Sequence, residues 1–168
     1  MKNLNVLFIA LLMLFASCSN DDDSVEEVDL TGTWEVSEVE FEGEATIEYE
    51  GFPITIPLTG FGKNMDAQVI ITENPNLVNS TGSFTAEITG SFFGQTETHD
   101  VPVDFSEYHQ NSSWYINGET LVLTRTDGVV INLQITTLTD TKVVLVGVET
   151  FTYEGEDVEL DTTYTLIR

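Results

Sequence analysis

The chain is poor in cysteine, proline, histidine and basic residues. It contains one cysteine, four prolines, two histidines and five Lys and Arg in 168 residues. One cysteine excludes an internal disulfide, so the domain has to be stabilised by its own hydrophobic core. The basic residues stand against 29 Asp and Glu, and the formal net charge is -24. Binding to nucleic acid requires clustered Lys and Arg that neutralise phosphates, so we expect no nucleic acid among the partners.

The sequence also lacks the local motifs of common catalytic and metal-binding sites. It has no Gly-x-Ser-x-Gly elbow, no glycine-rich phosphate loop and no His-Glu-x-x-His pair. The acidic run 154–157 lacks the alternating ligands of a calcium loop, so we expect a solvated turn there and no metal site. We also expect no cofactor and no enzymatic activity. The alternative of an enzyme depends on His99 as a base, whereas His109 is expected in a loop.

The longest hydrophobic run spans residues 4–15 and is too short to cross a bilayer comfortably. One lysine precedes it, and Ala16, Ser17 and Cys18 follow it. This order resembles the bacterial lipoprotein box, in which small residues precede a lipidated cysteine. The resemblance implies that residues 1–17 are a cleaved signal peptide and that acyl chains such as palmitate on Cys18 anchor the protein stably to a membrane. The alternative is an ordinary signal peptide whose cysteine is incidental.

Residues 18–29 are acidic and almost free of apolar side chains, which is typical of a solvated tether. An acidic run directly after the lipidated cysteine resembles the signal that directs some Gram-negative lipoproteins to the outer face of the outer membrane. The resemblance implies a lipid-anchored protein that faces the cell exterior. The net negative charge disfavours direct contact with anionic lipids, so the lipid is expected to be the only membrane contact. The alternative is a spacer that keeps the domain away from an anionic surface.

Residues 30–168 are expected to form one all-β domain. Apolar and polar residues alternate with a period of two through most of this region, and helical spacing is hard to find. The pattern predicts eight to ten strands, each with one apolar face and one polar face exposed to water. The alternation is clearest over residues 45–49, 52–58, 67–71, 84–88, 101–105, 121–123, 129–135 and 158–166.

Short turns between these runs favour antiparallel hairpins and leave no room for crossover helices. Turns are predicted at Asn117 with Gly118, Asp127 with Gly128, Glu42 with Gly43, Gly94, Thr139 with Asp140, and Gly155. Pro53 and Pro57 lie on the polar face of their run, which indicates an edge strand or a barrel lip. Consecutive hairpins bury their edges best by closing into an up-and-down barrel of about eight strands. A β-sandwich is the alternative.

The first predicted strand opens with Leu-Thr-Gly-Thr-Trp, which contains Gly32 and Trp34. This segment resembles the Gly-x-Trp signature of the lipocalins. The resemblance implies that Gly32 brings the chain close to the barrel floor and that Trp34 plugs it. It also implies that an arginine of the last strand packs over the indole. Arg168 is the first candidate for that arginine, and Arg125 is the other.

The family resemblance is incomplete elsewhere. The second lipocalin signature, Thr-Asp before an aromatic residue in a later turn, is only echoed at Thr139 and Asp140. This departure indicates an outlying member, of the kind found among small lipocalin-like lipoproteins. In the alternative interpretation, Trp34 is a core aromatic residue at the start of an unrelated β domain.

The barrel interior is the expected binding site for a small hydrophobic ligand. The candidate wall residues are Phe84, Ala86, Ile88, His99, Ile131, Leu133 and Tyr164. Aromatic residues near predicted turns are candidates for a rim or a partner surface: Phe92, Phe93, Trp114 and Tyr115. Phe92 and Phe93 are adjacent and cannot both face one side of a strand, so one of them is exposed unless a bulge buries both. The alternative function is a filled scaffold that engages an envelope protein or a glycan.

Overall fold

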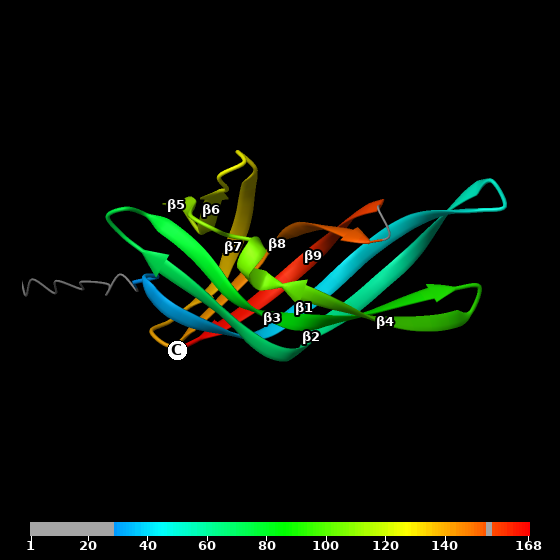
Figure 1. Ribbon diagram of the computed structural model, residues 1–168, viewed down its shortest axis with the longest axis horizontal. Helices are drawn as coiled ribbons and strands as arrows, with labels where there is room; N and C mark the ends of the chain where they lie inside the picture. The colour runs from blue at the N-terminus through cyan, green and yellow to red at the C-terminus, as the bar shows by residue number, and fades with distance from the viewer. Residues whose placement is uncertain (1–28, 154–155) are drawn as a thin grey trace, which may run out of the picture.

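A computed structural model describes residues 29–153 and 156–168, and these form nine antiparallel strands (Figure 1). Cys18 and the segments on either side of it lie outside the described residues. Within the described part of the chain, no helix is long and apolar enough to cross a membrane. The strands are β1 (Gly32–Tyr49), β2 (Phe52–Thr72), β3 (Leu77–Phe92), β4 (Gln95–Asp104), β5 (Ser112–Asn117), β6 (Thr120–Thr124), β7 (Val130–Leu138), β8 (Lys142–Tyr153) and β9 (Glu156–Ile167), with a short 3-10 helix η2 (Phe105–Glu107) after β4.

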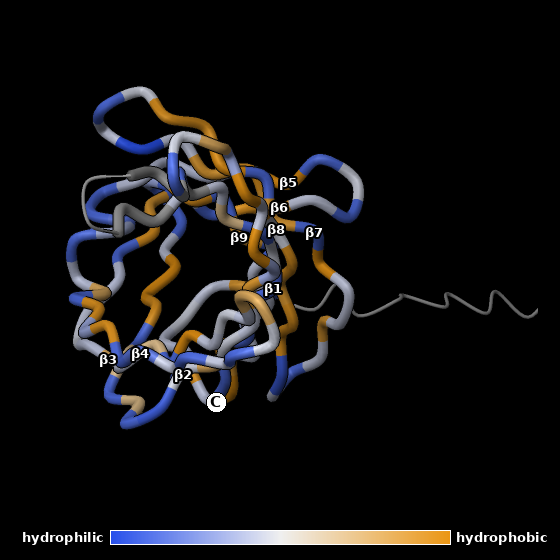
Figure 2. Tube along the Cα trace, turned by 90° about the vertical axis from the view of Figure 1, so that its right-hand side faces the viewer, coloured by the Kyte–Doolittle hydropathy of each residue, from blue (hydrophilic) through white to orange (hydrophobic). Residues whose placement is uncertain are grey.

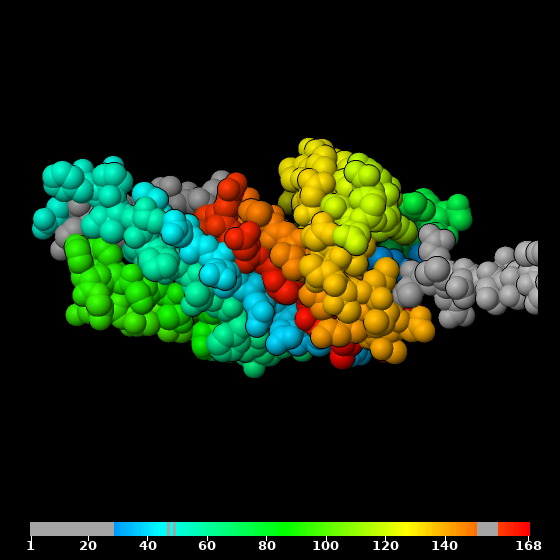
Figure 3. All heavy atoms as spheres, turned by 180° about the vertical axis from the view of Figure 1, so that it is seen from behind, coloured from blue at the N-terminus to red at the C-terminus, as the bar shows by residue number. Residues whose placement is uncertain are grey.

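The strands follow one another around a ring. Each strand from β5 to β9 pairs with the next, β9 pairs with β1, β1 with β2, and β2 with β3. Figure 2 shows this ring from its end. Figure 3 shows β2, β1, β9 and β8 side by side along one outer wall. The predicted all-β, up-and-down architecture is therefore confirmed, and the sandwich alternative is wrong.

The ring is nearly closed, and β4 departs from the simple meander. β4 pairs with residues 83–92 of β3, whereas β5 pairs with the same edge of β3 only at Leu77 and Val78. The connection from β4 to β5 is held to β3 through Ser80. The Ser80 hydroxyl donates to the Phe105 carbonyl (2.5 Å) and accepts from the His109 amide (3.1 Å). These bonds fold residues 105–109 against the interior.

Alternation along the strands builds the core. On β2, Ala67, Val69 and Ile71 are buried, whereas the residues between them are half-buried or exposed. Trp34 and Val143 are completely buried. Each strand therefore contributes one apolar face to a common interior, as the period of two predicts.

Most of the predicted turns lie where they were expected. The β5–β6 turn follows Asn117, with Gly118 at φ 62°, and the β6–β7 turn contains Asp127 and Gly128, the latter at φ 89°. Gly94 and the Thr139–Asp140 pair also lie in turns between consecutive strands. Gly155 lies outside the described residues. Glycine at these positions accommodates a positive φ that L side chains rarely adopt.

The turn predicted at Glu42 and Gly43 is wrong. Both residues lie within β1, and the hairpin to β2 turns instead at Glu50 and Gly51, which have φ of 52° and 82°. Gly43 is needed for another reason, since a Cβ there would lie 2.7 Å from Leu160 Cδ2. A glycine in a strand thus marks close approach of a neighbouring strand.

The two prolines of β2 confirm the barrel-lip interpretation. Pro53 and Pro57 pair with β1, and β2 meets β3 only from Leu58 onward. Residues 52–57 therefore have one edge without a ladder to β3, where a proline removes no hydrogen bond from the sheet.

Candidate functional site

The long hairpins leave a hollow at one end of the ring, which we call the mouth cavity. β1, β2, β3, β8 and β9 extend beyond the short strands β5 and β6. At this end, the space enclosed by β1, β2, β3, β4 and β9 has a volume of about 280 Å³. Its apolar lining consists of Ala45, Ile56, Leu58, Ile88, Gly90, Phe92, Val101, Val158 and Leu160, and its polar lining of Gln95, Glu97 and His99.

The mouth cavity is apolar because it is enclosed by the inward-facing positions of five strands. Leu58 of β2 is paired with Gly90 of β3. Because glycine has no side chain, nothing on β3 fills the space opposite the leucine on this side of the cavity. The volume lies just below the ~300–1,000 Å³ typical of ligand pockets. The cavity therefore suits a small ligand or one end of a longer one.

The polar rim of the mouth cavity comes from β4. The side chain of His99 is 56% exposed, and its Nε2 lies 3.6 Å from Oε2 of Glu97. His99 shares an inward register with Val101 and Val103, as predicted, but it lies where that face meets water. This arrangement provides hydrogen-bonding groups at the opening of the cavity and not inside the ring.

A second group of polar residues lies farther inside, and we call it the inner polar cluster: Tyr108, His109, Arg125, Glu149 and Tyr164. Glu149 is 5% exposed and His109 is 4% exposed. The Tyr164 hydroxyl donates a hydrogen bond to the Glu149 carboxyl group. Glu149 Oε1 and His109 Nδ1 have no hydrogen-bond partner among the described residues. Buried polar atoms of this kind are rare and often mark a bound water or ligand.

Burial changes the protonation of the inner polar cluster. It raises the pKa of Glu149 to about 7, while Arg125 and the Tyr164 hydrogen bond act in the opposite direction. It lowers the pKa of His109 to about 4, and the positive charge of Arg125 acts in the same direction. Burial, followed by the charge of Glu149, raises the pKa of Tyr164 well above its usual value. The interior therefore favours uncharged forms.

The opposite end of the ring is closed by Trp34, and we call this end the floor. The indole Nε1 donates to the Leu30 carbonyl (2.9 Å), and the Arg168 guanidinium carbon lies 4.1 Å from the ring centroid. Arg168 also donates to the main-chain carbonyls of Asp29, Thr31 and Asp140. The predicted contact between Arg168 and Trp34 is thus present, and Arg125 lies in the inner polar cluster instead.

The comparison with protein families agrees with this geometry. The sequence model of the lipocalin-like domain matches residues 30–145. The chain belongs to this family. Lipocalin-like domains commonly bind ligands and are generally not enzymes. Comparison with curated proteins and with solved structures gives no match.

The family match ends before several residues of this lipocalin-like domain that matter for the interior. It includes Trp34 of the floor and residues 45–101, which provide most of the mouth cavity. Glu149, Tyr164 and Arg168 follow the matched segment. Of the inner polar cluster, Tyr108, His109 and Arg125 lie within the matched segment, and only Glu149 and Tyr164 lie beyond it.

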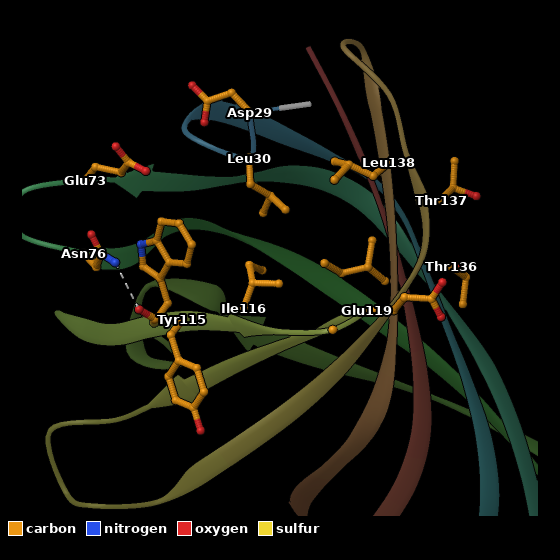
Figure 4. Close-up of a pocket in the computed structure, with 13 residues that line it drawn as sticks. Asp29, Leu30, Glu73, Asn76, Tyr115, Ile116, Glu119, Thr136, Thr137 and Leu138 are labelled. Atoms are coloured by element: carbon orange, nitrogen blue, oxygen red, sulfur yellow. Dashed lines mark hydrogen bonds between the residues drawn. The ribbon is translucent and has the colours of Figure 1, made fainter. Parts of the chain in front are cut away.

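The lipocalin-like domain also has an outer groove of about 730 Å³ near the floor. It lies between the β2–β3 turn, β5 and β7, and Figure 4 shows Leu30, Ile116 and Leu138 facing the same hollow. Asp29, Glu73 and Glu119 add three carboxylates to its lining. The groove is larger than the mouth cavity, and its lining is more polar.

The predicted wall residues fall into three groups. Ile88 and His99 line the mouth cavity. Leu133 and Tyr164 line a space of about 20 Å³ in the core, which has room for a single water molecule. The remaining three, Phe84, Ala86 and Ile131, are buried in the hydrophobic core and line none of the three cavities. Side chains thus fill the half of the ring nearer the floor, so five of the seven predicted wall residues do not line the mouth cavity.

The predicted rim residues are divided between the two ends. Phe92 lines the mouth cavity, and Phe93 is 76% exposed in the β3–β4 turn, so one of the pair is exposed as predicted. Trp114 and Tyr115 instead line the outer groove, and Trp114 Nε1 donates to the Thr72 carbonyl (2.9 Å). The two pairs lie at opposite ends of β3, so they do not form one surface.

Sequence reasoning missed Glu149 and His109. His109 lies in a loop, as expected, but its side chain is buried, because Phe105 packs on Phe84 and brings the loop inward. Glu149 could have been found. It follows Val143, Leu145 and Gly147 in one register of β8, so an acid stands at an inward position.

Proposed function

We propose that this lipocalin-like domain binds a small hydrophobic ligand in the mouth cavity. The observation that carries the proposal is the apolar hollow of about 280 Å³ enclosed by inward faces of β1, β2, β3, β4 and β9. Burial of an apolar ligand there releases water from both surfaces and favours binding. The outer groove is a poorer site for such a ligand because its lining is more polar and includes three carboxylates.

Binding can be tested with N-phenyl-1-naphthylamine, a neutral apolar dye that fluoresces when it leaves water. We expect saturable enhancement with the mature protein. In the variant Ala45→Phe, the new ring occupies the cavity, and the dissociation constant should rise at least about tenfold. Thr46→Phe is the matched control, because Thr46 is exposed on the opposite face of β1. It should leave the dissociation constant unchanged.

Two results would contradict ligand binding at the mouth. The first is the absence of saturable enhancement with the unmodified protein. The second is equal binding by the two phenylalanine variants. The first result would favour the alternative function, a filled scaffold that engages an envelope protein or a glycan.

We further propose that Cys18 is lipidated and displays the domain on the outer membrane. The described chain begins at Asp29, next to the floor, and Figure 1 shows the β1–β2 and β3–β4 turns at the far end of the molecule. A tether of residues 18–28 can span at most roughly 40 Å. Anchoring through it directs the mouth away from the attachment point, toward the medium.

The anchor is tested by fractionating cells that produce Cys18→Ala. The variant should appear in soluble fractions, whereas Ser19→Ala, the matched control, should remain with the membrane. Surface display is tested by adding protease to intact cells. A Cys18→Ala protein that stays with the membrane would refute the lipid anchor, and a protected wild-type domain would refute display.

A further inference from the structure

Glu149 does not itself line the mouth cavity, but its cross-strand neighbour does. Glu149 on β8 is paired with Leu160 on β9, and both side chains are buried on the inner face. Leu160 is part of the cavity lining. Deeper in the ring, Tyr164 reaches the same carboxyl group from β9. Glu149 therefore stands between the mouth cavity and the packed core.

This carboxyl group is incompletely satisfied. The Tyr164 hydroxyl supplies one hydrogen bond to it. Glu149 Oε1 has no partner among the described residues, although the side chain is buried and only 5% of Glu149 is exposed. Leaving a buried acceptor without a donor destabilises the protein, and more strongly when the acceptor is charged. A donor brought by a ligand would recover that free energy.

The charges around Glu149 leave it available to a ligand. Arg125 lies close enough to influence it electrostatically, but its guanidinium is paired with Asp127 (2.8 Å). The other titratable groups that face Glu149 are Tyr108 and Tyr164, both neutral at physiological pH. Neighbouring His109 is also neutral there, because burial lowers its pKa to about 4.

We propose that the ligand is an amphipathic amine, with its apolar body in the mouth cavity and its ammonium group on the Glu149 carboxylate. This inference rests on the proposed function. An ammonium group provides both the missing donor and a compensating charge. An anionic head group would be repelled by Glu149, by Glu97 at the rim and by the net charge of -24.

The test compares octylamine, 1-octanol and octanoate, which share a similar apolar body, as competitors of bound N-phenyl-1-naphthylamine. At about pH 8 we expect octylamine to displace the dye about tenfold better than octanol, and octanoate to be the weakest. At about pH 6 Glu149 is mostly protonated, and a bound amine must release that proton. The advantage of the amine should therefore shrink severalfold, whereas displacement by octanol should not change.

Variants then place the preference at Glu149. In Glu149→Gln, the affinities for octylamine and octanol should fall within a factor of about two of each other. Glu159→Gln is the matched control, since Glu159 is exposed on the outer face beside Leu160 and should keep the full preference. The pH dependence of the unmodified protein requires no variant and tests the inference even if Glu149→Gln folds poorly.

Each remaining outcome overturns a defined statement. Equal displacement by octylamine and octanol from a protein that binds the dye would refute the amine and leave the proposed function standing. A preference removed by Glu97→Gln and kept by Glu149→Gln would move recognition to the rim and refute the role of Glu149. Failure of the dye to bind at all would refute the proposed function itself.

Discussion

The floor and the mouth are built from the same strands and differ in how completely side chains fill them. At the floor, Trp34 is fully buried, its indole donates to a carbonyl and Arg168 covers its face. At the mouth, Leu58, Ile88 and Val158 are only half-buried around a hollow. The same alternation thus gives a packed core at one end and an open apolar surface at the other.

The difference arises from strand length and not from composition. The ring is complete only where β5, β6 and β7 face the longer strands. Beyond them, the hairpin ends have apolar inner faces with nothing opposite to pack on. Stability is therefore expected to be concentrated near the floor, and binding near the mouth. Four variants test this division.

The largest effect is expected at the floor. Trp34→Ala removes a fully buried aromatic side chain and should lower the free energy of unfolding by about 3–5 kcal/mol, as typical for such cavities. Urea denaturation measures it. Trp114→Ala is the matched control. Trp114 is only half-buried, so its truncation should lower the free energy of unfolding by less. Similar losses for the two tryptophans would contradict a special role for the floor.

The next effect comes from Glu149, between floor and mouth. The folded-state pKa of about 7 exceeds the usual 4.5, so the folded protein keeps a proton that the unfolded chain has lost between these pH values. The contribution of Glu149 to stability therefore falls as the pH rises from 4.5 to 7. The Glu149→Gln variant has no carboxyl group to titrate at this position. Its free energy of unfolding should therefore rise by roughly 3 kcal/mol relative to that of the wild type over that interval.

His109 acts in the opposite direction, which makes the comparison with Glu149→Gln necessary. Its folded-state pKa of about 4 lies below the usual 6.5, so its contribution is lost as the pH falls through that interval. The difference between wild type and Glu149→Gln cancels this and other titrations. A difference that does not change with pH would show that Glu149 titrates normally.

A smaller effect is expected for Arg168→Met, which keeps some packing but removes the guanidinium over Trp34. We expect a loss of about 1–3 kcal/mol from the cation–π contact and the hydrogen bonds to main-chain carbonyls. Arg168→Lys should lose part of this. Lys142→Met, at an exposed position of the same end, controls for removing a positive charge. Equal effects of Arg168→Met and Lys142→Met would reduce the role of Arg168 to its charge.

The smallest effect is expected at the mouth. Phe93 is 76% exposed, so Phe93→Ala should change the free energy of unfolding by less than about 0.5 kcal/mol. Phe84→Ala, in the packed part of the ring, should cost several kcal/mol. The two urea midpoints compare the ends directly. A large loss for Phe93→Ala would mean that the mouth contributes to stability as the floor does.

Particular residues show how far sequence reasoning extends. Gly32 and Trp34 were identified from one motif, the family resemblance implied an arginine over the indole, and its inward register made Arg168 the first candidate for the contact that the structure contains. The turn at residues 42–43 was wrong because glycine serves both turns and close packing, and local sequence does not distinguish the two.

The candidate site was harder to predict for a different reason. The inward faces of Ile88 and His99 followed from alternation, but whether such positions line a hollow or fill a core depends on what stands opposite them. Phe84 and Ile131 have the same pattern and are buried by partners from distant strands. The burial of His109 depended on Phe105 folding inward against Phe84.

The sequence by itself determined the strands, their inner faces and most of the turns, since these depend on neighbours two residues apart and on local backbone preferences. Its resemblance to the lipocalin signature added the residues of the floor. Only the tertiary structure decided where the ring is filled and where it is hollow. Those properties depend on strand lengths and on volumes contributed by segments that are far apart in the chain, and no local pattern records them.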